Sequence, residues 1–539
     1  MKKRGILYNS IFTSTAFWLF IALVVLWIPW LGETPFYSKG EPREAIVAVS
    51  ILHGGDWILP VNFGGDIPYK PPFLAWLIAV FAWIFNGGEV NEFISRLPSA
   101  LAAIAMIMMG FHWARRAQGD RFALIMALVT ATSFEVFRAA TACRVDMVLT
   151  AAMVGAIYII HEIRQRPGRD NVGWYAAAAG MLTVATLTKG PVGSLLPCLA
   201  AGIYLLLRGD NFFKTAGKML LLCIVSFILP ALWYYAAWKR GGDAFIDLAW
   251  EENIGRLTGT MSYSSHEKPF WYNFVTIIAG MLPWTLLALL SFFRAGTFRH
   301  WPFKPTGLLA MVTACTVILF YCIPTSKRSV YLLPAYPFMA YGITVLIESL
   351  RGTAVTRFFG RTMAFLGIAV PVAMFVLAFL HNPFVDDFSL AHWWQWLFVL
   401  VPLAASVWWY MGRSKSPVAM PTIFTLFLCY SAAVMPSVLR NPLKTDDTAA
   451  KFEQIRDSEG LVWAYRHPQA GSAYWMNYYL DDRMRSLQST EQTDTMAIGR
   501  VIIFNEPTDT ATLSDSWRIE SFGYNPDQRR QAWLATKIR

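Results

Sequence analysis

Charged residues are scarce in this chain. Asp, Glu, Lys and Arg make up 15% of the 539 residues, whereas hydrophobic residues make up 55%. A soluble globular protein carries about 25% charged residues, so the composition argues against a soluble protein and favours a membrane protein. The net charge of +11 would suggest nucleic-acid binding in a soluble protein. In a membrane protein, basic loops and attraction to anionic lipid headgroups explain it.

Paired cysteines and nucleotide-binding glycine motifs are also missing. The six cysteines form no Cys-X-X-Cys pair, and they lie in or beside apolar segments rather than in the polar C-terminal region. This pattern argues against a disulfide framework and a zinc ribbon. No Gly-rich strand-to-helix fingerprint for a nucleotide occurs. No internal repeat or low-complexity segment is evident, which argues against the interpretation of the chain as a transporter built from inverted repeats.

What the sequence does contain is a regular alternation of apolar segments and short polar loops up to about residue 440. Every second loop carries a cluster of Lys and Arg, and the positive-inside rule assigns such loops to the cytoplasm. The loops between them then face outward, and the motif-like residues gather there. The clusters are Lys2, Lys3, Arg4; Arg115, Arg116, Arg121; Arg164, Arg166, Arg169; Arg208, Lys214, Lys218; Arg294, Arg299, Lys304; Arg351, Arg357, Arg361; and Arg413, Lys415.

This pattern predicts an α-helical polytopic membrane protein with about thirteen transmembrane helices, each near the length that crosses a hydrocarbon core of ~30 Å. The first apolar segment has no small-residue cleavage site after it and is interpreted as a signal anchor that stays in place. The apolar stretch 73–86 is interpreted as an interfacial or re-entrant helix. Counting it as a span would place every later loop on the opposite side of the membrane, with Arg115 and Arg116 outside. The predicted spans are 11–31, 95–113, 121–138, 147–163, 173–187, 191–207, 217–237, 273–293, 307–323, 329–349, 361–380, 394–412 and 418–437.

Two domains are predicted. Residues 1–437 form a transmembrane domain, which includes a long outer loop, 32–94, with interfacial helices. Residues 438–539 are more polar and are predicted to form a small soluble α/β domain outside the cytoplasm. The strand and helix signals of this domain are the runs Leu461–Tyr465 and Val501–Phe504 and the segment from Thr445 through Arg456.

The outer loop opens with an acidic segment, 38–44 (SKGEPRE). Proline favours the first turn of a helix, which places Glu41 near the N-cap and Glu44 in the first turn. Both carboxylates could simply cap this helix. Glu41 also follows a flexible glycine just after the first span, where a carboxylate can reach the membrane face. The apolar residues downstream, at 45–52, have helical spacing and predict a short helix lying on the membrane surface.

Lys70 is followed by two prolines, Pro71 and Pro72, which fix the direction of the backbone immediately after it. An ammonium group held in this way at the membrane surface is a natural partner for a lipid phosphate. The alternative is a lysine that snorkels to the interface without a specific ligand.

Asp146 lies where an outer loop enters the next span. A carboxylate at the edge of the hydrocarbon is costly unless it is paired or functional. Asp146 is therefore a candidate active-site group, and the alternative is a structural ion pair with Arg144 or Arg138.

Several basic residues break the positive-inside pattern, because they lie in predicted outer loops. Basic residues against that bias suggest anion binding, here of a phosphate or pyrophosphate. His266 beside Glu267 could also bind a metal ion, although a single histidine is more often a hydrogen-bonding or surface residue. The outer basic residues are Lys189, His266, Lys268, Lys327 and Arg328.

Taken in order, the outer motifs resemble those of the GT-C glycosyltransferases of the aminoarabinose transferase and protein O-mannosyltransferase type. The match covers most of residues 1–340, and thirteen spans with an outer C-terminal domain agree with this type. The motifs are the acidic first loop, Lys70-Pro71-Pro72 followed by Trp76, Asp146 at a later outer span end, Thr188-Lys189-Gly190, His266 before Pro269-Phe270-Trp271-Tyr272, and Ser326-Lys327-Arg328 before Tyr331-Leu332-Leu333-Pro334.

The resemblance implies transfer of a sugar, with inversion, from polyprenyl (undecaprenyl) phosphate to a lipid A-like phosphate or another acceptor on the outer face of the cytoplasmic membrane. No required cofactor is implied, and a divalent metal at His266 and Glu267 stays open. The expected partners are the lipid-linked donor, a lipid or protein acceptor and membrane lipids, not nucleic acid. The implied site comprises the carboxylates Glu41 and Asp146; the donor-phosphate residues Lys70, Tyr331, His266, Lys268, Lys189, Lys327 and Arg328; and the substrate-loop residues Arg43, Glu44 and Tyr69.

The chain departs from this type at two positions. Gly40-Glu41 stands where an Asp-Glu pair is usual, which leaves Glu41 to act alone. Tyr69 stands where an acid often precedes the lysine, which argues against a metal site built on that acid. Two other functions stay open: transfer to Ser or Thr of proteins, and a lipid or sugar transporter or flippase. A transporter would carry charged residues in mid-span, whereas the informative charges here lie at outer span ends.

Overall fold

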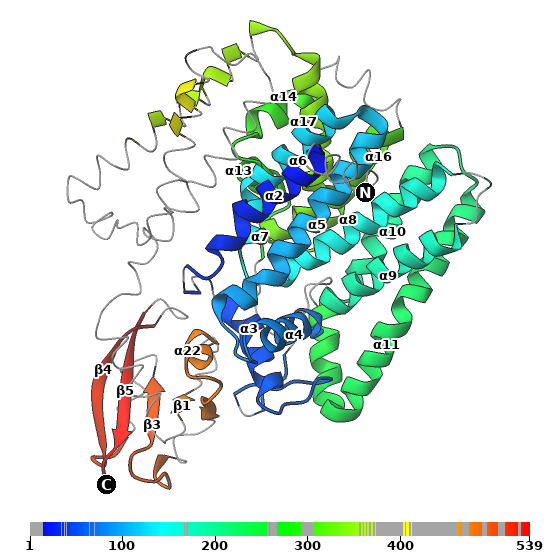
Figure 1. Ribbon diagram of the computed structural model, residues 1–539. Helices are drawn as coiled ribbons and strands as arrows, with labels where there is room; N and C mark the ends of the chain where they lie inside the picture. The colour runs from blue at the N-terminus through cyan, green and yellow to red at the C-terminus, as the bar shows by residue number, and fades with distance from the viewer. Residues whose placement is uncertain are drawn as a thin grey trace, which may run out of the picture. The chain divides into compact units, whose positions relative to one another are not determined.

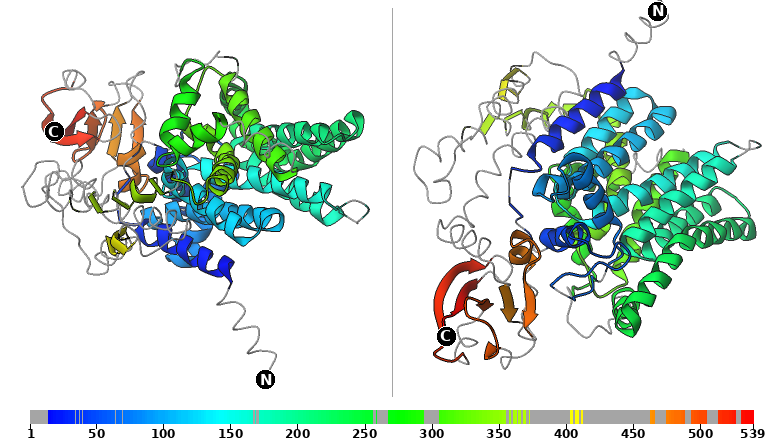
Figure 2. Two further views of the ribbon diagram at one scale, coloured as in Figure 1. Left: turned by 90° about the horizontal axis from the view of Figure 1, so that it is seen from above. Right: turned by 60° about the horizontal axis from the view of Figure 1, so that its bottom comes forward.

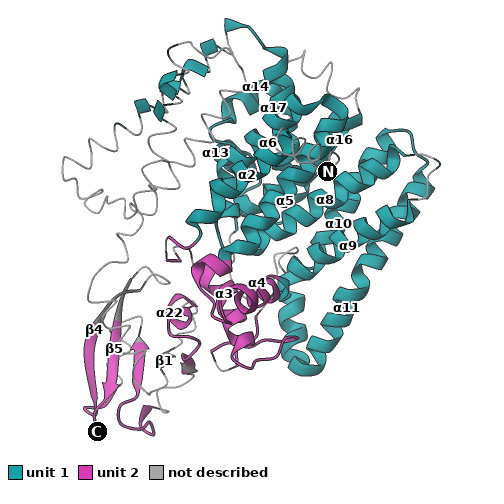
Figure 3. Cartoon of the chain, viewed as in Figure 1, with its two compact units in different colours: residues 1–31, 69–73, 96–435 teal, residues 32–68, 74–95, 436–539 magenta. Residues whose placement is uncertain are grey.

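The structure is a computed structural model with two compact units (Figure 3). The first unit comprises residues 1–31, 69–73 and 96–435, and the second comprises residues 32–68, 74–95 and 436–539. The described residues are 14–293, except 34, 37, 39, 64, 69, 167, 169–170, 256–257 and 259–266; 305–354; scattered positions between 357 and 411; and 462–465, 474–487, 493–504, 513–525 and 530–539.

Helices make up the described part of the first unit (Figures 1 and 2). Their bounds are α2 Thr15–Trp27, η1 Ile28–Trp30, α5 Glu92–Gln118, α6 Asp120–Thr132, α7 Phe134–Ala140, α8 Val145–Arg164, α9 Val172–Lys189, α10 Val192–Leu207, α11 Phe212–Trp250, η2 Glu251–Gly255, α13 Tyr272–Gly280, α14 Thr285–Phe293, α16 Pro305–Cys322, η3 Ser329–Ala335 and α17 Tyr336–Ser349. The first residues of α5 belong to the second unit.

Within the described residues, five helical segments are long and apolar enough to cross a membrane: α5, α8, α11 with η2, α16, and η3 with α17. The bent pair of α6 and α7 makes six if it counts as one span, and α2 with η1, α4 (Phe73–Phe85) and α10 are shorter apolar helices. The prediction of a helical, multi-pass membrane protein is confirmed. The number of thirteen spans stays a prediction, because the predicted spans 361–380, 394–412 and 418–437 fall mostly or wholly outside the described residues.

The predicted span 121–138 is a broken helix rather than a continuous one. α6 and α7 meet at Ser133, whose backbone is extended, and the two helices are bent by 70°. The Ser133 hydroxyl donates to the carbonyl of Val129 at 2.8 Å, and the indole of Trp284 donates to the hydroxyl of Thr132 at 2.8 Å. Side-chain hydrogen bonds of this kind satisfy polar groups at a break in a helix.

The helices of the first unit differ in what they face. Nearly every residue of α8 is buried, and α8 packs against α9 and α10. A Cβ at Gly155 of α8 would lie 3.1 Å from the Met109 methyl group, so a small residue permits this close packing. In contrast, α11 exposes a row of large apolar side chains, among them Leu220, Ile224 and Ile228. In a membrane protein such a row faces lipid.

The second unit combines the first outer loop with the C-terminal region. Its helices are α3 (Gly40–Leu52), α4 (Phe73–Phe85, of which Phe73 belongs to the first unit) and α22 (Tyr474–Tyr479). The five strands in its described part form one sheet in the order β2-β1-β3-β5-β4, with β1 parallel to β2 and β3 and the other pairs antiparallel. The strands are β1 Val462–Tyr465, β2 Arg485–Leu487, β3 Val501–Phe504, β4 Trp517–Asn525 and β5 Arg530–Lys537.

Contacts far apart in the sequence hold this unit together. The Tyr479 hydroxyl accepts from the backbone N–H of Phe36 at 3.1 Å, and Asp482 accepts from the N–H of Phe63 at 3.1 Å. The Phe63 side chain joins a buried cluster with residues of α22, β3 and β5. Residues 32–68 and 74–95 thus group with 436–539. The boundary between a transmembrane domain and a C-terminal domain at residue 437 stays a prediction.

The helix predicted at the start of the outer loop exists as α3, but its surroundings differ from the prediction. Nearly all its residues are buried, and α22 packs against it. A helix lying on the membrane would present one face to lipid. The interfacial interpretation of 40–52 is therefore corrected: its apolar side chains pack inside the protein.

Candidate active site

Asp146 and Lys189 form a buried ion pair in the first unit. The Lys189 Nζ lies 2.5 Å from Asp146 Oδ1, and both side chains are largely buried. The same Nζ lies 4.1 Å from the centroid of the Tyr331 ring, a distance at which an ammonium is attracted to the face of an aromatic ring. Three residues from the sequence prediction thus meet at one point.

Helix ends place the two charges. Asp146 lies in the first turn of α8, and Lys189 is the last residue of α9. A helix N-terminus favours an anion and a C-terminus a cation. Gly190 then ends α9 with φ +82°, and a Cβ there would lie 2.5 Å from Asn253 Oδ1. Only glycine fits this position, so the Thr-Lys-Gly-Pro motif fixes the lysine where the chain turns.

Two further cations act on the Asp146 carboxylate. The positive charges of Lys70 and Arg144 both stabilise it electrostatically. Arg144 is the residue before α8, and its carbonyl accepts from the Ser99 hydroxyl at 3.2 Å. Three cations therefore act on one carboxylate: Lys189 by direct contact, and Lys70 and Arg144 through their charge. A cluster of cations of this kind suits an anionic ligand.

The predicted alternative for Asp146 was a pair with Arg144 or Arg138. The direct contact is made by Lys189 instead, and Arg138 pairs with Glu135 at 2.5 Å. Arg138 also donates to the hydroxyl of Ser329 at 3.3 Å. The buried Glu135 is not among the residues predicted from the sequence, although an acid three residues before an arginine in an apolar segment is a signal for such a pair.

The segments around Lys268 and Lys327 lie side by side. Glu267 and Ser326 form an isolated β-bridge, and the N–H of Lys268 donates to the carbonyl of Thr325 at 3.1 Å. The buried Lys327 ammonium donates to the carbonyl of Pro324. This pairing brings the two predicted outer motifs together next to η3, the helix that carries Tyr331.

The remaining predicted site residues either lie on other segments than the Asp146–Lys189 pair or fall outside the described residues. His266 and Tyr69 are outside them, so the metal prediction stays untested; among the residues that are described, no group of three His, Cys, Asp or Glu side chains could hold a metal ion. Arg328 directly precedes η3. Glu41, Arg43 and Glu44 lie on α3 in the second unit.

Two contacts of the α3 carboxylates are with residues close in the sequence. Glu41 is fully buried, and Ser38 Oγ donates to Glu41 Oε2 at 3.2 Å. Arg43 and Glu44 form an ion pair at 3.0 Å. The Ser38 bond joins two side chains and satisfies no backbone N–H, so it does not test the capping interpretation of Glu41, while the complete burial of its carboxylate agrees with a functional one. Both interpretations stay open for Glu41.

The Tyr331 ring lies against a tyrosine that the sequence analysis did not select. The ring centroids of Tyr321 and Tyr331 are 5.3 Å apart, and the Tyr321 carbonyl accepts from the Asn273 amide at 2.8 Å. Because Tyr321 lies in an apolar span, the sequence alone does not distinguish it from a residue that faces lipid.

Comparisons with known proteins agree with the motifs. Residues 69–235, which include Lys70, Asp146 and Lys189, match a family described as dolichyl-phosphate-mannose-protein mannosyltransferase. An uncharacterized protein of Aquifex aeolicus is 30% identical over 56% of this chain. The undecaprenyl phosphate-alpha-4-amino-4-deoxy-L-arabinose arabinosyl transferase of Edwardsiella ictaluri is 26% identical over 62% of this chain. The matched regions span 65% and 60% of these two relatives.

The fold has a counterpart among solved structures. The crystal structure of ArnT from Cupriavidus metallidurans bound to undecaprenyl phosphate aligns with a TM-score of 0.74 at 21% sequence identity. The alignment covers 97% of this chain and 98% of that one. The resemblance predicted from the motifs is thus confirmed: the chain is a multi-pass membrane protein with the fold of this ArnT structure, and its sequence is similar to the aminoarabinose and protein mannosyl transferases.

Proposed function

We propose that this protein is a glycosyltransferase that moves a sugar from undecaprenyl phosphate to a lipid A-like phosphate. The observation that carries the proposal is the buried Asp146–Lys189 pair within the field of Lys70 and Arg144. A departing polyprenyl phosphate is an anion, and fixed cations stabilise the charge that develops on it. The names of the arabinosyl transferase relative and of the ArnT structure support undecaprenyl phosphate as the carrier.

The reaction breaks the bond between the anomeric carbon and the donor phosphate oxygen, and it forms a bond from that carbon to an acceptor oxygen on the opposite face. Lys70, Lys189 and the other predicted phosphate residues would hold the leaving phosphate. Asp146 fixes the Lys189 ammonium against the Tyr331 ring. A phosphate acceptor needs little base catalysis, so Asp146 would position groups; a hydroxyl acceptor must lose its proton, which a carboxylate can take.

The direct test is an assay of the purified full chain with undecaprenyl-phosphate aminoarabinose and lipid A. We expect aminoarabinose-modified lipid A in the mass spectrum, and loss of this modification in a deletion strain. Unmodified lipid A in the assay, together with an unchanged lipid A spectrum in the deletion strain, would refute the proposed acceptor.

A second candidate is transfer of a sugar to Ser or Thr of proteins, because residues 69–235 match the mannosyltransferase family. The same deletion strain separates the two functions. Loss of hexose from secreted proteins with lipid A unchanged would assign the protein acceptor, whereas the opposite result is expected.

We further propose that the chain lies in the cytoplasmic membrane with thirteen spans and with its active site and C-terminal α/β region on the periplasmic side. The basic clusters support this orientation, since all of them then face the cytoplasm. A reporter fused after Arg539 should be active outside the cytoplasm, and one inserted near Gln118 should report the cytoplasm. If the Arg539 fusion is active in the cytoplasm, the proposed orientation is wrong and the active site must be assigned to the other side of the membrane.

The role of Glu41 can be separated from helix capping. If its carboxylate lines the site, Glu41→Gln should lower turnover by a factor on the order of 10², whereas loss of a cap would cost only about 0.5–2 kcal/mol of stability. Turnover and melting temperature should be measured on the same purified protein. Glu92→Gln is a control, because it removes another carboxylate of the second unit that is hydrogen-bonded by Tyr479. Normal turnover of Glu41→Gln would move the assignment to Glu44.

A further inference from the structure

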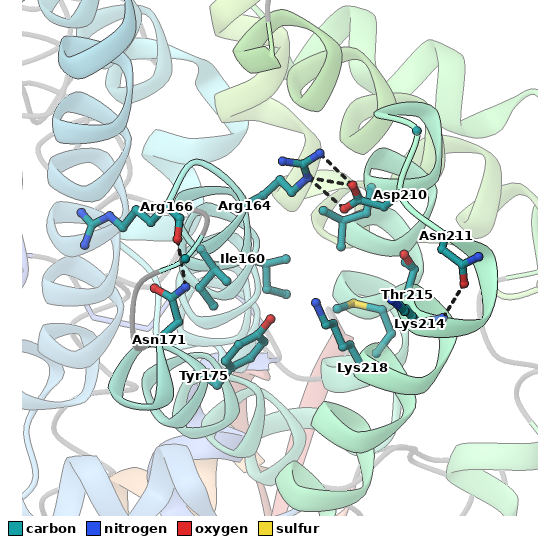
Figure 4. Close-up of a pocket in the computed structure, with 15 residues that line it drawn as sticks. Ile160, Arg164, Arg166, Asn171, Tyr175, Asp210, Asn211, Lys214, Thr215 and Lys218 are labelled. Atoms are coloured by element: carbon teal, nitrogen blue, oxygen red, sulfur yellow. Dashed lines mark hydrogen bonds and ion pairs between the residues drawn. The ribbon is translucent and has the colours of Figure 1, made fainter.

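A cavity of about 480 Å³ lies where four helices of the first unit end (Figure 4). It is lined by residues from the last turn of α8, the start of α9, the end of α10 and the start of α11. Arg164, at the end of α8, lines it, while Asp146 lies in the first turn of the same helix. The rise of 1.5 Å per residue puts these two residues about 27 Å apart. The cavity is therefore separate from the candidate active site and lies at the opposite end of α8.

The arginines of this cavity already have partners. Arg164 binds Asp210 through its Nε at 2.8 and 2.9 Å and through Nη2 at 2.8 Å. Arg166 lies 4.2 Å from the centroid of the Trp174 ring and pairs with Glu162 at 3.4 Å. These contacts fix the walls of the cavity, and the one acidic residue among its lining residues, Asp210, is engaged by Arg164.

Two lysines line the cavity in addition. Lys214 and Lys218 are one turn apart on α11, and within the described part of the chain neither ammonium forms an ion pair. Two like charges at this spacing on a helix repel each other. An anion between them would remove that repulsion. In Figure 4 the Lys218 and Tyr175 side chains, from α11 and α9, point toward the space between these helices.

The surface beside the cavity is apolar and exposed. Val172, Leu207, Phe212 and Phe213, at the ends of the same helices, are 60–81% exposed. From there α11 continues with the exposed apolar row of Leu220, Ile224 and Ile228 already described. A free phosphate ion gains nothing from such a surface, whereas the acyl chains of a lipid would cover it.

We propose that this cavity binds the phosphate headgroup of an anionic membrane lipid. Lys214 and Lys218 contact the phosphate, and the acyl chains lie along the exposed face of α11. Basic pockets between transmembrane helices take anionic headgroups through this combination of charge and apolar surface. The basic loops on both sides of the cavity would place it at the cytoplasmic leaflet, so the lipid bound there is not the sugar donor of the proposed reaction.

The test is native mass spectrometry of the purified full chain titrated with phosphatidylglycerol and, separately, with phosphatidylcholine. The wild type should prefer phosphatidylglycerol, and Lys214→Gln/Lys218→Gln should bind it about 25-fold more weakly, since each lysine near a headgroup contributes about fivefold. Both lysines are exposed, so thermal unfolding should be unchanged. Lys239→Gln, which removes an exposed lysine further along α11, should bind phosphatidylglycerol as the wild type does.

The proposed site would be overturned if the double variant bound phosphatidylglycerol as tightly as the wild type does, or if Lys239→Gln lost as much affinity as the double variant. An excess of inorganic phosphate should not displace the lipid. Displacement by inorganic phosphate would overturn the assignment to a lipid and make this a site for the free anion.

Discussion

Asp146→Asn should lower the rate of sugar transfer by a factor of roughly 10²–10⁴. The substitution keeps the shape of the side chain and removes the charge that holds the Lys189 ammonium at 2.5 Å. It also removes a carboxylate on which the charges of Lys70 and Arg144 act. Turnover should be measured on purified variants with an undecaprenyl-phosphate sugar, together with the melting temperature.

A buried charge left without its partner also destabilises a protein, by about 3–5 kcal/mol, so stability must be separated from chemistry. Glu135→Gln is a matched control, because it breaks another ion pair of the first unit, between the buried Glu135 and Arg138. It should lower the melting temperature but leave turnover per folded molecule near the wild-type value. Equal turnover in Asp146→Asn and Glu135→Gln would remove Asp146 from the active site.

The double variant Asp146→Asn/Lys189→Met separates the effect on stability from the effect on turnover more sharply. Removing both partners of a buried pair leaves no unpaired charge, and such replacements are often neutral or stabilising. The melting temperature should therefore recover relative to Asp146→Asn, while turnover should stay low. Recovery of turnover together with stability would mean that the pair is only structural.

The sequence predicted the positions of these residues better than their contacts. Span ends can be located from hydropathy and charge, so Asp146 and Lys189 were both predicted at outer helix ends. Which arginine or lysine meets Asp146 depends on how α8 packs against α9, across 43 residues of sequence. Nearest-neighbour candidates such as Arg144 were therefore favoured, and the contact belongs to Lys189.

The same limit applies to α3 and to the C-terminal sheet. The spacing of apolar residues predicted the helix 40–52 correctly, but spacing does not tell whether lipid or protein covers an apolar face. The runs 461–465 and 501–504 correspond to β1 and β3. Strands β4 and β5 were not predicted, because each mixes polar and apolar residues without a long apolar run, and their antiparallel pairing is a tertiary contact.

Lys70→Ala should lower turnover by a factor of roughly 10²–10³, the usual cost of losing one group that stabilises an oxyanion. Pro71 and Pro72, both buried, fix the backbone just after Lys70 whatever its side chain, so loss of the ammonium should not unfold the protein. Lys70→Arg should also be impaired, because a planar guanidinium does not replace a compact ammonium. Turnover and the binding of undecaprenyl phosphate should be measured together, and full activity of Lys70→Ala would exclude a role for Lys70.

A double variant of Lys70 and Asp146 tests independently whether the two residues act in one site. The charge of Lys70 acts on Asp146 in the structure, and residues that share one network show non-additive effects when both are changed. Lys70→Ala/Asp146→Asn should therefore lose less activity than the product of the two single losses. Independent, multiplying losses would mean that the two residues act at separate steps. Undecaprenyl phosphate carries no sugar, so its binding does not report on contacts with the sugar. A loss of this binding in Lys70→Ala but not in Asp146→Asn would assign the lysine to the phosphate and the carboxylate to the sugar or acceptor.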